Sequence, residues 1–216
     1  MMDRPFDLSG EGRAWVEVGL DALVHNASQL CLALPHGCEL MAVVKADAYG
    51  HGAERVAARL RDAGYKTFAV ATVGEGVRLR ESGLDGEILV MSYTHPKNTA
   101  LLRDFRLTQL VVDAAHAQAL NNMGYKIRVH ISLDTGMRRE GFDINKPHEI
   151  EEVFSYGNLA IEGIETHLSS SDSLDEDDIK FTDYQIKRFN STIGYLRDRG
   201  YSVGKLHVQA SYGLLN

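Results

Sequence analysis

Short apolar runs recur along this chain, and segments with helical periodicity separate them. Seven of these runs have the length of strands: Glu39–Lys45, Thr67–Ala71, Glu87–Met91, Thr108–Val112, Lys126–Leu133, Ala160–His167 and Lys205–Gln209. Such alternation is typical of repeated βα units, in which each helix returns the chain to begin another parallel strand. The pattern therefore predicts an α/β protein built on a parallel sheet.

The helical segments end as helices in such a fold should. The main candidates are Ala53–Ala63, Gly74–Glu81, Ala114–Met123 and Asp178–Arg199. A glycine follows each one, as expected where the chain turns left-handed after the last helical residue: Gly64, Gly83, Gly124 and Gly200. Another helix, Asp21–Leu34, stops at Pro35, and a separate strand is expected before it at Ala14–Val18.

A (β/α)8 barrel that lacks about its last strand fits this order best, and an open α/β sheet is the alternative. A full barrel takes about 250 residues, whereas this chain has 216 and stops soon after the seventh strand. We therefore expect residues 1–19 to form an N-terminal segment with one strand. Residues 20–216 are expected to form a barrel that is incomplete at its C-terminus.

Charge and composition exclude several classes of function. The net charge is −7 and no basic cluster occurs, which argues against a nucleic-acid partner. No apolar run approaches the roughly 18 residues that cross a bilayer, so no membrane contact is expected. Cys31 and Cys38 are too few for a disulfide scaffold and lack the pattern of a zinc site. A cytoplasmic protein acting on a small molecule fits best.

Lys45 stands at the end of the first expected strand. Residues 43–52 read VVKADAYGHG, so an apolar run passes directly into residues that favour a loop. Parallel barrels carry their chemistry at the carboxyl ends of strands, and a lysine desolvated there becomes a nucleophile toward aldehydes. The alternative is a strand-end lysine whose charge simply reaches solvent.

Residues 134–142, which read DTGMRREGF, follow the fifth expected strand. Two glycines, an aspartate and adjacent arginines at a strand end predict a tight functional loop. An arginine in it can donate a planar pair of N–H groups to a carboxylate or a phenolate. The alternative is a solvated, charged turn.

Two further strand ends carry polar side chains. His167 closes the sixth expected strand, where a lone histidine is more often structural than functional. Ser211 follows the seventh, where barrel enzymes commonly hold phosphate, although a turn serine is the simpler alternative. Between them, residues 169–178 (SSSDSLDEDD) predict an acidic loop that leads into the last helix, whose N-terminus favours carboxylates. A metal site in this loop is a weaker alternative, and none is predicted.

These stretches resemble, in the same order, four motifs of the alanine racemase family. The first is its cofactor-lysine motif and the second its Asp-Thr-Gly-Met-x-Arg-x-Gly motif; Thr166-His167 and residues 207–211 (HVQAS) resemble its Thr-His and His-x-x-x-Ser. The sequence in and around these motifs most resembles the branch containing the alanine/serine racemases of vancomycin resistance. The resemblance implies the family's N-terminal barrel without its β-rich second domain, and hence a C-terminally truncated chain.

For the site, the resemblance implies pyridoxal 5′-phosphate (PLP) as cofactor. Lys45 would hold PLP as an aldimine and act as one catalytic base. Tyr49 and Ser211 would bind its phosphate, and His167 would lie beside its ring. Arg139 would contact the phenolic oxygen of PLP and the carboxylate of the substrate.

The register of the second motif selects Arg139 over Arg138 for this role. The chain also departs from the family, because many members have a carbamylated lysine where Ser132 stands. The support that this lysine gives the arginine must therefore come from elsewhere here, and a bound anion is one candidate.

The resemblance implies racemisation of L-alanine to D-alanine, a cell-wall component, by transfer of the Cα proton. Inversion needs a second acid/base on the opposite face, which in the family is a tyrosine of the second domain supplied across a homodimer. These 216 residues are therefore expected to be inactive alone. The alternatives are serine as substrate, a single-domain PLP-binding protein without turnover, and a nonenzymatic remnant.

Overall fold

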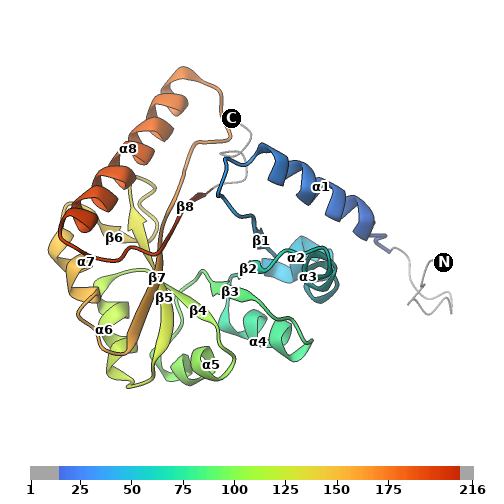
Figure 1. Ribbon diagram of the computed structural model, residues 1–216, viewed down its shortest axis with the longest axis horizontal. Helices are drawn as coiled ribbons and strands as arrows, with labels where there is room; N and C mark the ends of the chain where they lie inside the picture. The colour runs from blue at the N-terminus through green and yellow to red at the C-terminus, as the bar shows by residue number, and fades with distance from the viewer. Residues whose placement is uncertain (1–14, 210–216) are drawn as a thin grey trace.

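The computed structural model describes residues 15–209, in which a curved parallel sheet carries helices around its outer side (Figure 1). The strands are β1 (Met41–Val43), β2 (Thr67–Val70), β3 (Glu87–Val90), β4 (Thr108–Val111), β5 (Ile127–Asp134), β6 (Phe142–Asp143), β7 (Leu159–His167) and β8 (Lys205–Gln209). The helices are α1 (Leu20–Ala33), α2 (Lys45–Gly50), α3 (Ala53–Asp62), α4 (Val73–Glu81), the 3₁₀ helix η1 (Pro96–Asn98), α5 (Thr99–Asp104), α6 (Ala114–Asn122), α7 (Pro147–Val153) and α8 (Glu176–Asp198).

The order of the strands shows which α/β architecture this is. The sheet runs β1-β2-β3-β4-β5-β7-β8, all parallel, with the short β6 attached only to β5. A doubly wound sheet would reverse its strand order partway and place helices on both faces. Here the order never reverses, and α3 to α8 lie around the outside (Figure 1). The expected barrel is confirmed as a curled half-barrel of seven principal strands, and the open-sheet alternative is wrong.

The local predictions hold in most places and fail at the N-terminus. All seven expected strands form, with ends shifted by up to a few residues. The strand expected at Ala14–Val18 is wrong for residues 15–18, since they have no regular structure; Ala14 lies outside the described residues. Trp15 and Val16 are 71% and 65% exposed, so they do not pack against the sheet. The short elements α5, α7 and β6 were not identified, because so few residues show no clear periodicity.

The core lies mainly between the sheet and its helices. All four residues of β2 and of β4 are buried, as is usual for parallel strands covered on both faces. Phe68 and Val70 pack toward the helices, while Ala69, between them, joins Leu89 and Leu110 on the inner face. Alternate residues therefore line the interior of the half-barrel, and one residue each from β2, β3 and β4 forms a small apolar cluster there.

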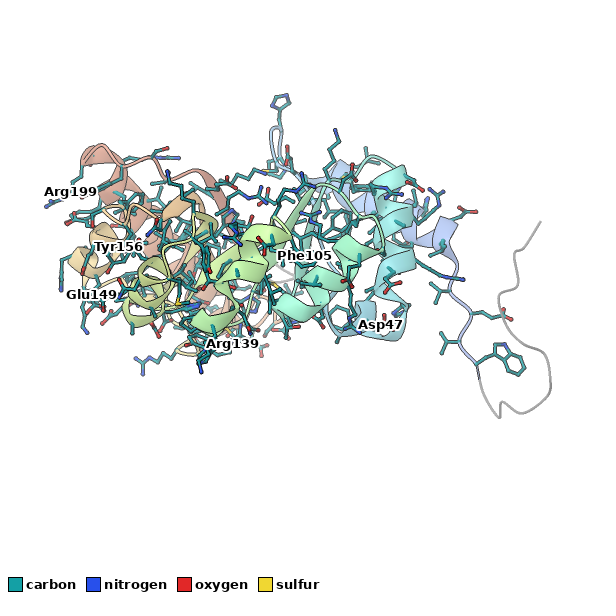
Figure 2. The ribbon with its side chains drawn as sticks, turned by 90° about the horizontal axis from the view of Figure 1, so that it is seen from below. Asp47, Phe105, Arg139, Glu149, Tyr156 and Arg199 are labelled. Atoms are coloured by element: carbon teal, nitrogen blue, oxygen red, sulfur yellow. The ribbon has the colours of Figure 1, made fainter. Side chains whose placement is uncertain are left out.

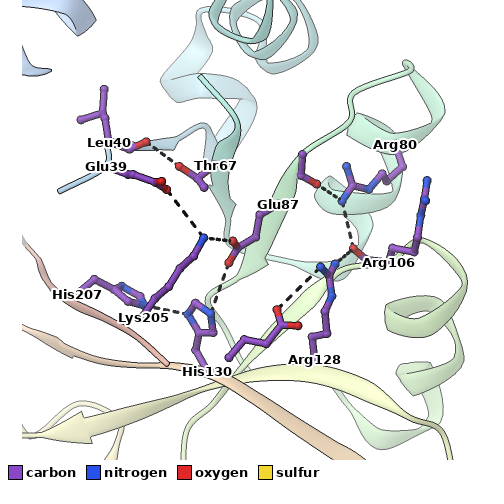
Figure 3. Close-up of polar contacts among 12 residues, drawn as sticks. Glu39, Leu40, Thr67, Arg80, Glu87, Arg106, Arg128, His130, Lys205 and His207 are labelled. Carbon is purple, nitrogen blue, oxygen red and sulfur yellow. Dashed lines mark hydrogen bonds and ion pairs between the residues drawn. The ribbon is translucent and has the colours of Figure 1, made fainter. Parts of the chain in front are cut away.

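Polar side chains fill the interior nearer the amino ends of β3 and β8 (Figure 3). Lys205 Nζ lies 2.7 Å from Glu87 Oε2, and Glu87 Oε1 lies 3.5 Å from His130 Nε2. His130 Nδ1 is 2.9 Å from His207 Nε2. Burial lowers the pKa of His130 to about 4 and that of His207 to about 3, so both rings are neutral at neutral pH. A Cβ on Gly163 would lie 2.9 Å from the His130 ring, so this position needs a glycine.

No helix in residues 15–209 combines the length and the apolar character that crossing a bilayer requires; α8, with 23 residues, carries charges along its length.

Candidate active site

Lys45 lies directly after the first strand, at the carboxyl end of the sheet. Val44 before it is 2% exposed and donates its N–H to Ala69 O of β2 at 2.8 Å, which anchors the chain at this point. Lys45 itself is half-buried and opens α2. Figure 2 shows Asp47 and Arg139 toward the same side of the molecule. Because β1 and β5 belong to one parallel sheet, the segments that follow them lie at its carboxyl-end opening, the mouth of the half-barrel.

The four residues after Lys45 form a left-handed turn. Ala46, Asp47, Ala48 and Tyr49 have φ of 50°, 56°, 51° and 55°, although none is glycine. This conformation costs roughly 1–2 kcal/mol for each such residue, and strain of this kind persists only where the surroundings impose it. The backbone path beside Lys45 therefore costs stability, which the contacts around it must offset.

Glu75 holds this turn in place. Its Oε1 accepts a hydrogen bond from Ala46 N at 2.8 Å, and its Oε2 accepts from Ala71 N at 2.7 Å and Thr72 N at 3.0 Å. Thr72 Oγ1 in turn accepts from Glu75 N, which completes a capping box at the start of α4. Glu75 was not predicted as a site residue, although Thr72 and Glu75 have the spacing of a capping box.

Asp47 fixes the far end of the turn. Its Oδ1 accepts a hydrogen bond from Ala53 N at 2.8 Å, at the start of α3, and its backbone oxygen accepts from Gly52 N. Tyr49 is 63% exposed. Ser211, the other expected phosphate ligand, lies outside the described residues, and phosphate binding by this pair stays a prediction.

The loop after β5 is tight, as its glycines predicted. Asp134 Oδ1 accepts from Gly136 N and from Arg138 N, both at 3.0 Å, and Arg138 has a φ of 57°. A Cβ on Gly141 would lie 2.6 Å from Asp134 N, so the loop can close only with glycine there. Arg139 extends from this loop with its side chain 55% exposed, 3.5 Å from Glu140 Oε1.

His167 ends β7, close enough to two cations for their charges to act on its ring. Burial lowers the pKa of its imidazole, and the positive charges of Arg139 and Lys45 lower it further. The three residues come from the carboxyl ends of β1, β5 and β7, which are not adjacent in the sequence. The structure therefore brings Lys45, Arg139 and His167 together, while their individual roles stay predictions.

A buried amide on α8 connects the carboxyl ends of β5 and β7 by hydrogen bonds. Gln185 is 0% exposed; its Nε2 donates to His167 O at 3.1 Å and Thr135 Oγ1 at 3.3 Å, and its Oε1 accepts from Ser169 N at 3.0 Å. Gln185 was not predicted as a site residue, although it lies on the buried face of α8 together with Phe189. The four-residue step from Gln185 to Phe189 was the available signal.

Ser132 and Glu165 form a second buried pair below the mouth. Ser132 Oγ donates to Glu165 Oε1 at 2.5 Å between β5 and β7, where the two residues are register partners. Desolvation raises the pKa of the Glu165 carboxyl to about 7, against the lowering effect of this hydrogen bond. Ser132 stood out in the sequence, whereas its partner Glu165 was not predicted.

The acidic loop before α8 shows part of what was expected. Glu176, Asp177 and Asp178 lie in the first turn of the helix, where its dipole favours negative charge. Asp175 is the N-cap residue, but its side chain makes no capping hydrogen bond. No group of three metal-ligating side chains converges within residues 15–209.

Fold and site together define a parallel βα-barrel domain with a lysine at the mouth of its interior. The sequence profile described as "Alanine racemase, N-terminal domain" matches residues 18–216. The chain belongs to the alanine racemase family.

Individual relatives agree with this assignment. An amino-acid racemase of Enterococcus faecalis and a serine/alanine racemase of Enterococcus gallinarum are each 41% identical over 204 residues, which cover 94% of this chain and 29% of theirs. The solved alanine racemase of Clostridium difficile 630 is 30% identical with a TM-score of 0.85, over 91% of this chain and 55% of that one. The chain thus spans less than a third of those two relatives and about half of the solved enzyme.

Proposed function

We propose that this chain is the PLP-binding barrel of an amino-acid racemase that acts on alanine or serine. The observation that carries the proposal is the meeting of Lys45, Arg139 and His167 at one mouth, with two positive charges acting on a half-buried imidazole. Family membership and the names of the relatives support the same reaction class. Residues 15–209 supply the groups on one side of the reacting carbon.

The residues present fit PLP by their chemistry. The cofactor has an aldehyde, which requires an amine, and it carries anionic oxygens, which require cationic partners. Lys45 is half-buried, and no carboxylate pairs with it among the described residues, so its amine is available. The side chain of Arg139 is partly exposed and can turn toward an anion. When bound, PLP withdraws electrons and so acidifies the Cα proton of an amino acid.

The three side chains then have separate tasks. Lys45 holds the cofactor and carries the proton between its Nζ and one face of Cα. Arg139 presents two parallel N–H groups to an anionic oxygen, which orients the ligand. His167 stays neutral at neutral pH because of burial and the two cations, so it hydrogen-bonds without adding a third positive charge. The hydrogen bonds of Gln185 and Glu75 hold the backbone segments that carry these groups.

Covalent labelling tests the assignment of Lys45. The 216-residue chain is incubated with PLP, reduced with borohydride and digested, and the labelled peptide is identified by mass spectrometry. We expect the label on Lys45, its loss in Lys45→Met, and its retention in Lys97→Met, which removes a surface lysine. A label that stays at full yield in Lys45→Met would overturn the assignment.

We further propose that these residues alone exchange the Cα proton without inverting the centre. Lys45 can act on one face only, and the second base is expected from the part of the family's length that residues 15–209 do not include. Incubation with PLP and L-alanine in deuterated water should give deuterated L-alanine and no D-alanine. Rapid formation of D-alanine would contradict this. PLP binding without any exchange would favour the alternative of a PLP-binding protein without turnover.

A further inference from the structure

Glu165 carries a carboxyl group that the proposed reaction does not use and that burial makes costly. The residue is 8% exposed, and among the described residues its side chain hydrogen-bonds to the hydroxyl of Ser132, which is itself 3% exposed. A buried carboxylate with a single neutral partner is unfavourable unless a nearby cation compensates for the lost water. The position of the nearest cation therefore helps to determine whether the Glu165 carboxyl group is charged or neutral.

The loop that bears Arg139 closes directly over this pair. A Cβ on Gly141 would lie 3.2 Å from Ser132 Oγ, so the backbone two residues after Arg139 packs against the serine. Gly141 N donates to Val112 O at 2.9 Å, which fixes that end of the loop. Arg139 and Glu140 are thus the charged residues nearest along the chain to the point of contact. The charge of Arg139 stabilises the Glu165 carboxylate, while that of Glu140 opposes it.

We propose that Glu165, held by Ser132, is the positioning residue for Arg139. In its ionised form the Glu165 carboxylate draws the guanidinium toward the strand ends, where it faces His167. In its neutral form it releases Arg139 toward Glu140 and solvent. The inference deepens the proposed function, since Arg139 is the residue through which Glu165 would act on a bound ligand.

The two states interchange near neutral pH. Desolvation raises the pKa of Glu165 to about 7, with Ser132 and Arg139 lowering it and Glu140 raising it. On β8, His207 is the register partner of Glu165, but its ring bonds to His130 and its pKa is about 3, so it is neutral in this range. On β7 itself, the pKa of His167 is also lowered. Glu165 is therefore the group here whose charge changes around pH 7.

Nuclear magnetic resonance of the 216-residue chain, without any cofactor, tests the coupling directly. The Nε–Hε signal of Arg139 is identified by its loss in Arg139→Lys and followed from pH 5.5 to 8.5. We expect this signal to shift with a midpoint near the pKa of Glu165, to lose the inflection in Glu165→Gln, and to keep it in the matched control Glu140→Gln. An inflection that survives Glu165→Gln, or that disappears only in Glu140→Gln, would overturn the proposal.

The reciprocal measurement covers the case in which Glu165→Gln fails to fold. The carboxyl carbon of Glu165 is titrated in the parent chain and in Arg139→Gln. Coupling between two sites is mutual, so loss of the cation should raise the midpoint by on the order of one pH unit. Ser132→Ala should raise it as well, because the hydrogen bond favours the charged form. An unchanged midpoint in Arg139→Gln would refute the coupling.

A failure of this proposal can be distinguished from a failure of the proposed function. If PLP does not label Lys45 but the Arg139 and Glu165 titrations are coupled, the proposed function fails and the positioning role stands. If PLP labels Lys45 and the titrations are independent, the function stands and the positioning role fails.

Discussion

The Glu75 carboxylate and the backbone N–H of Ala46 are joined by a 2.8 Å hydrogen bond, across 29 residues of sequence. Ala46 is the first of four residues with left-handed backbone after Lys45, and the same carboxylate also binds Ala71 N and Thr72 N. One side chain of α4 thus connects the loops after β1 and β2. The position of the lysine depends on this connection.

Replacing Glu75 should therefore affect both stability and the reactivity of Lys45. Glu75→Ala leaves three backbone donors without their carboxylate, and we expect a loss of about 2 kcal/mol in the free energy of unfolding. The left-handed turn should relax, so PLP should label Lys45 more slowly. Urea denaturation and timed labelling measure the two effects. Glu81→Ala, at the exposed far end of α4, is the control, and equal effects from the two variants would contradict the role of Glu75.

Arg139 and Arg138 are neighbours in one loop but should differ in effect. Arg139→Gln removes a charged hydrogen-bond donor worth roughly 1.5–3 kcal/mol, so PLP affinity should fall by about 10-fold or more. Arg138→Gln should change it little, because the loop uses Arg138 through its backbone N–H, which the substitution keeps. Absorbance titrations with PLP give both affinities. Equal losses would show that the motif register is wrong.

Gln185 should contribute more to stability than its polar character suggests. Gln185→Leu keeps most of the volume but leaves Ser169 N and His167 O without their partner inside the fold. The expected cost is about 1–3 kcal/mol in the free energy of unfolding. Gln118→Leu, at an exposed position of α6, is the control and should cost a few tenths at most. A Gln185→Leu variant as stable as its parent would contradict this account.

Acid should destabilise the fold through His130 and His207. Burial lowers the pKa of both rings below the ordinary value of 6.5, to about 4 and about 3. The unfolded chain therefore binds more protons than the folded chain as pH falls below 6.5, and their contribution to stability is lost from there downward. The urea midpoint should drop less between pH 7.5 and 5.0 in His207→Gln than in the parent. The control His36→Gln, at an exposed position, should keep the parental drop.

The sequence itself determined the architecture of this protein. Apolar strand-like runs separated by helical segments are local patterns, and each reports one βα unit whatever surrounds it. The same holds for the lysine, the arginine loop and the histidine, because each directly follows or closes a strand and parallel strands end at one edge. The position of these motifs on strand ends could therefore be predicted, as could the tight turn at Gly136 and Gly141.

Only the tertiary structure decided how those groups are held. The left-handed path after Lys45 opposes the intrinsic preference of four non-glycine residues and exists because Glu75, from another βα unit, accepts the Ala46 N–H. Gln185 on the buried face of α8, and the pairing of Ser132 with Glu165, depend on contacts across 16 to 50 residues. Burial raises the pKa of Glu165 and lowers that of His167, and burial is a property of the packed barrel rather than of any local pattern.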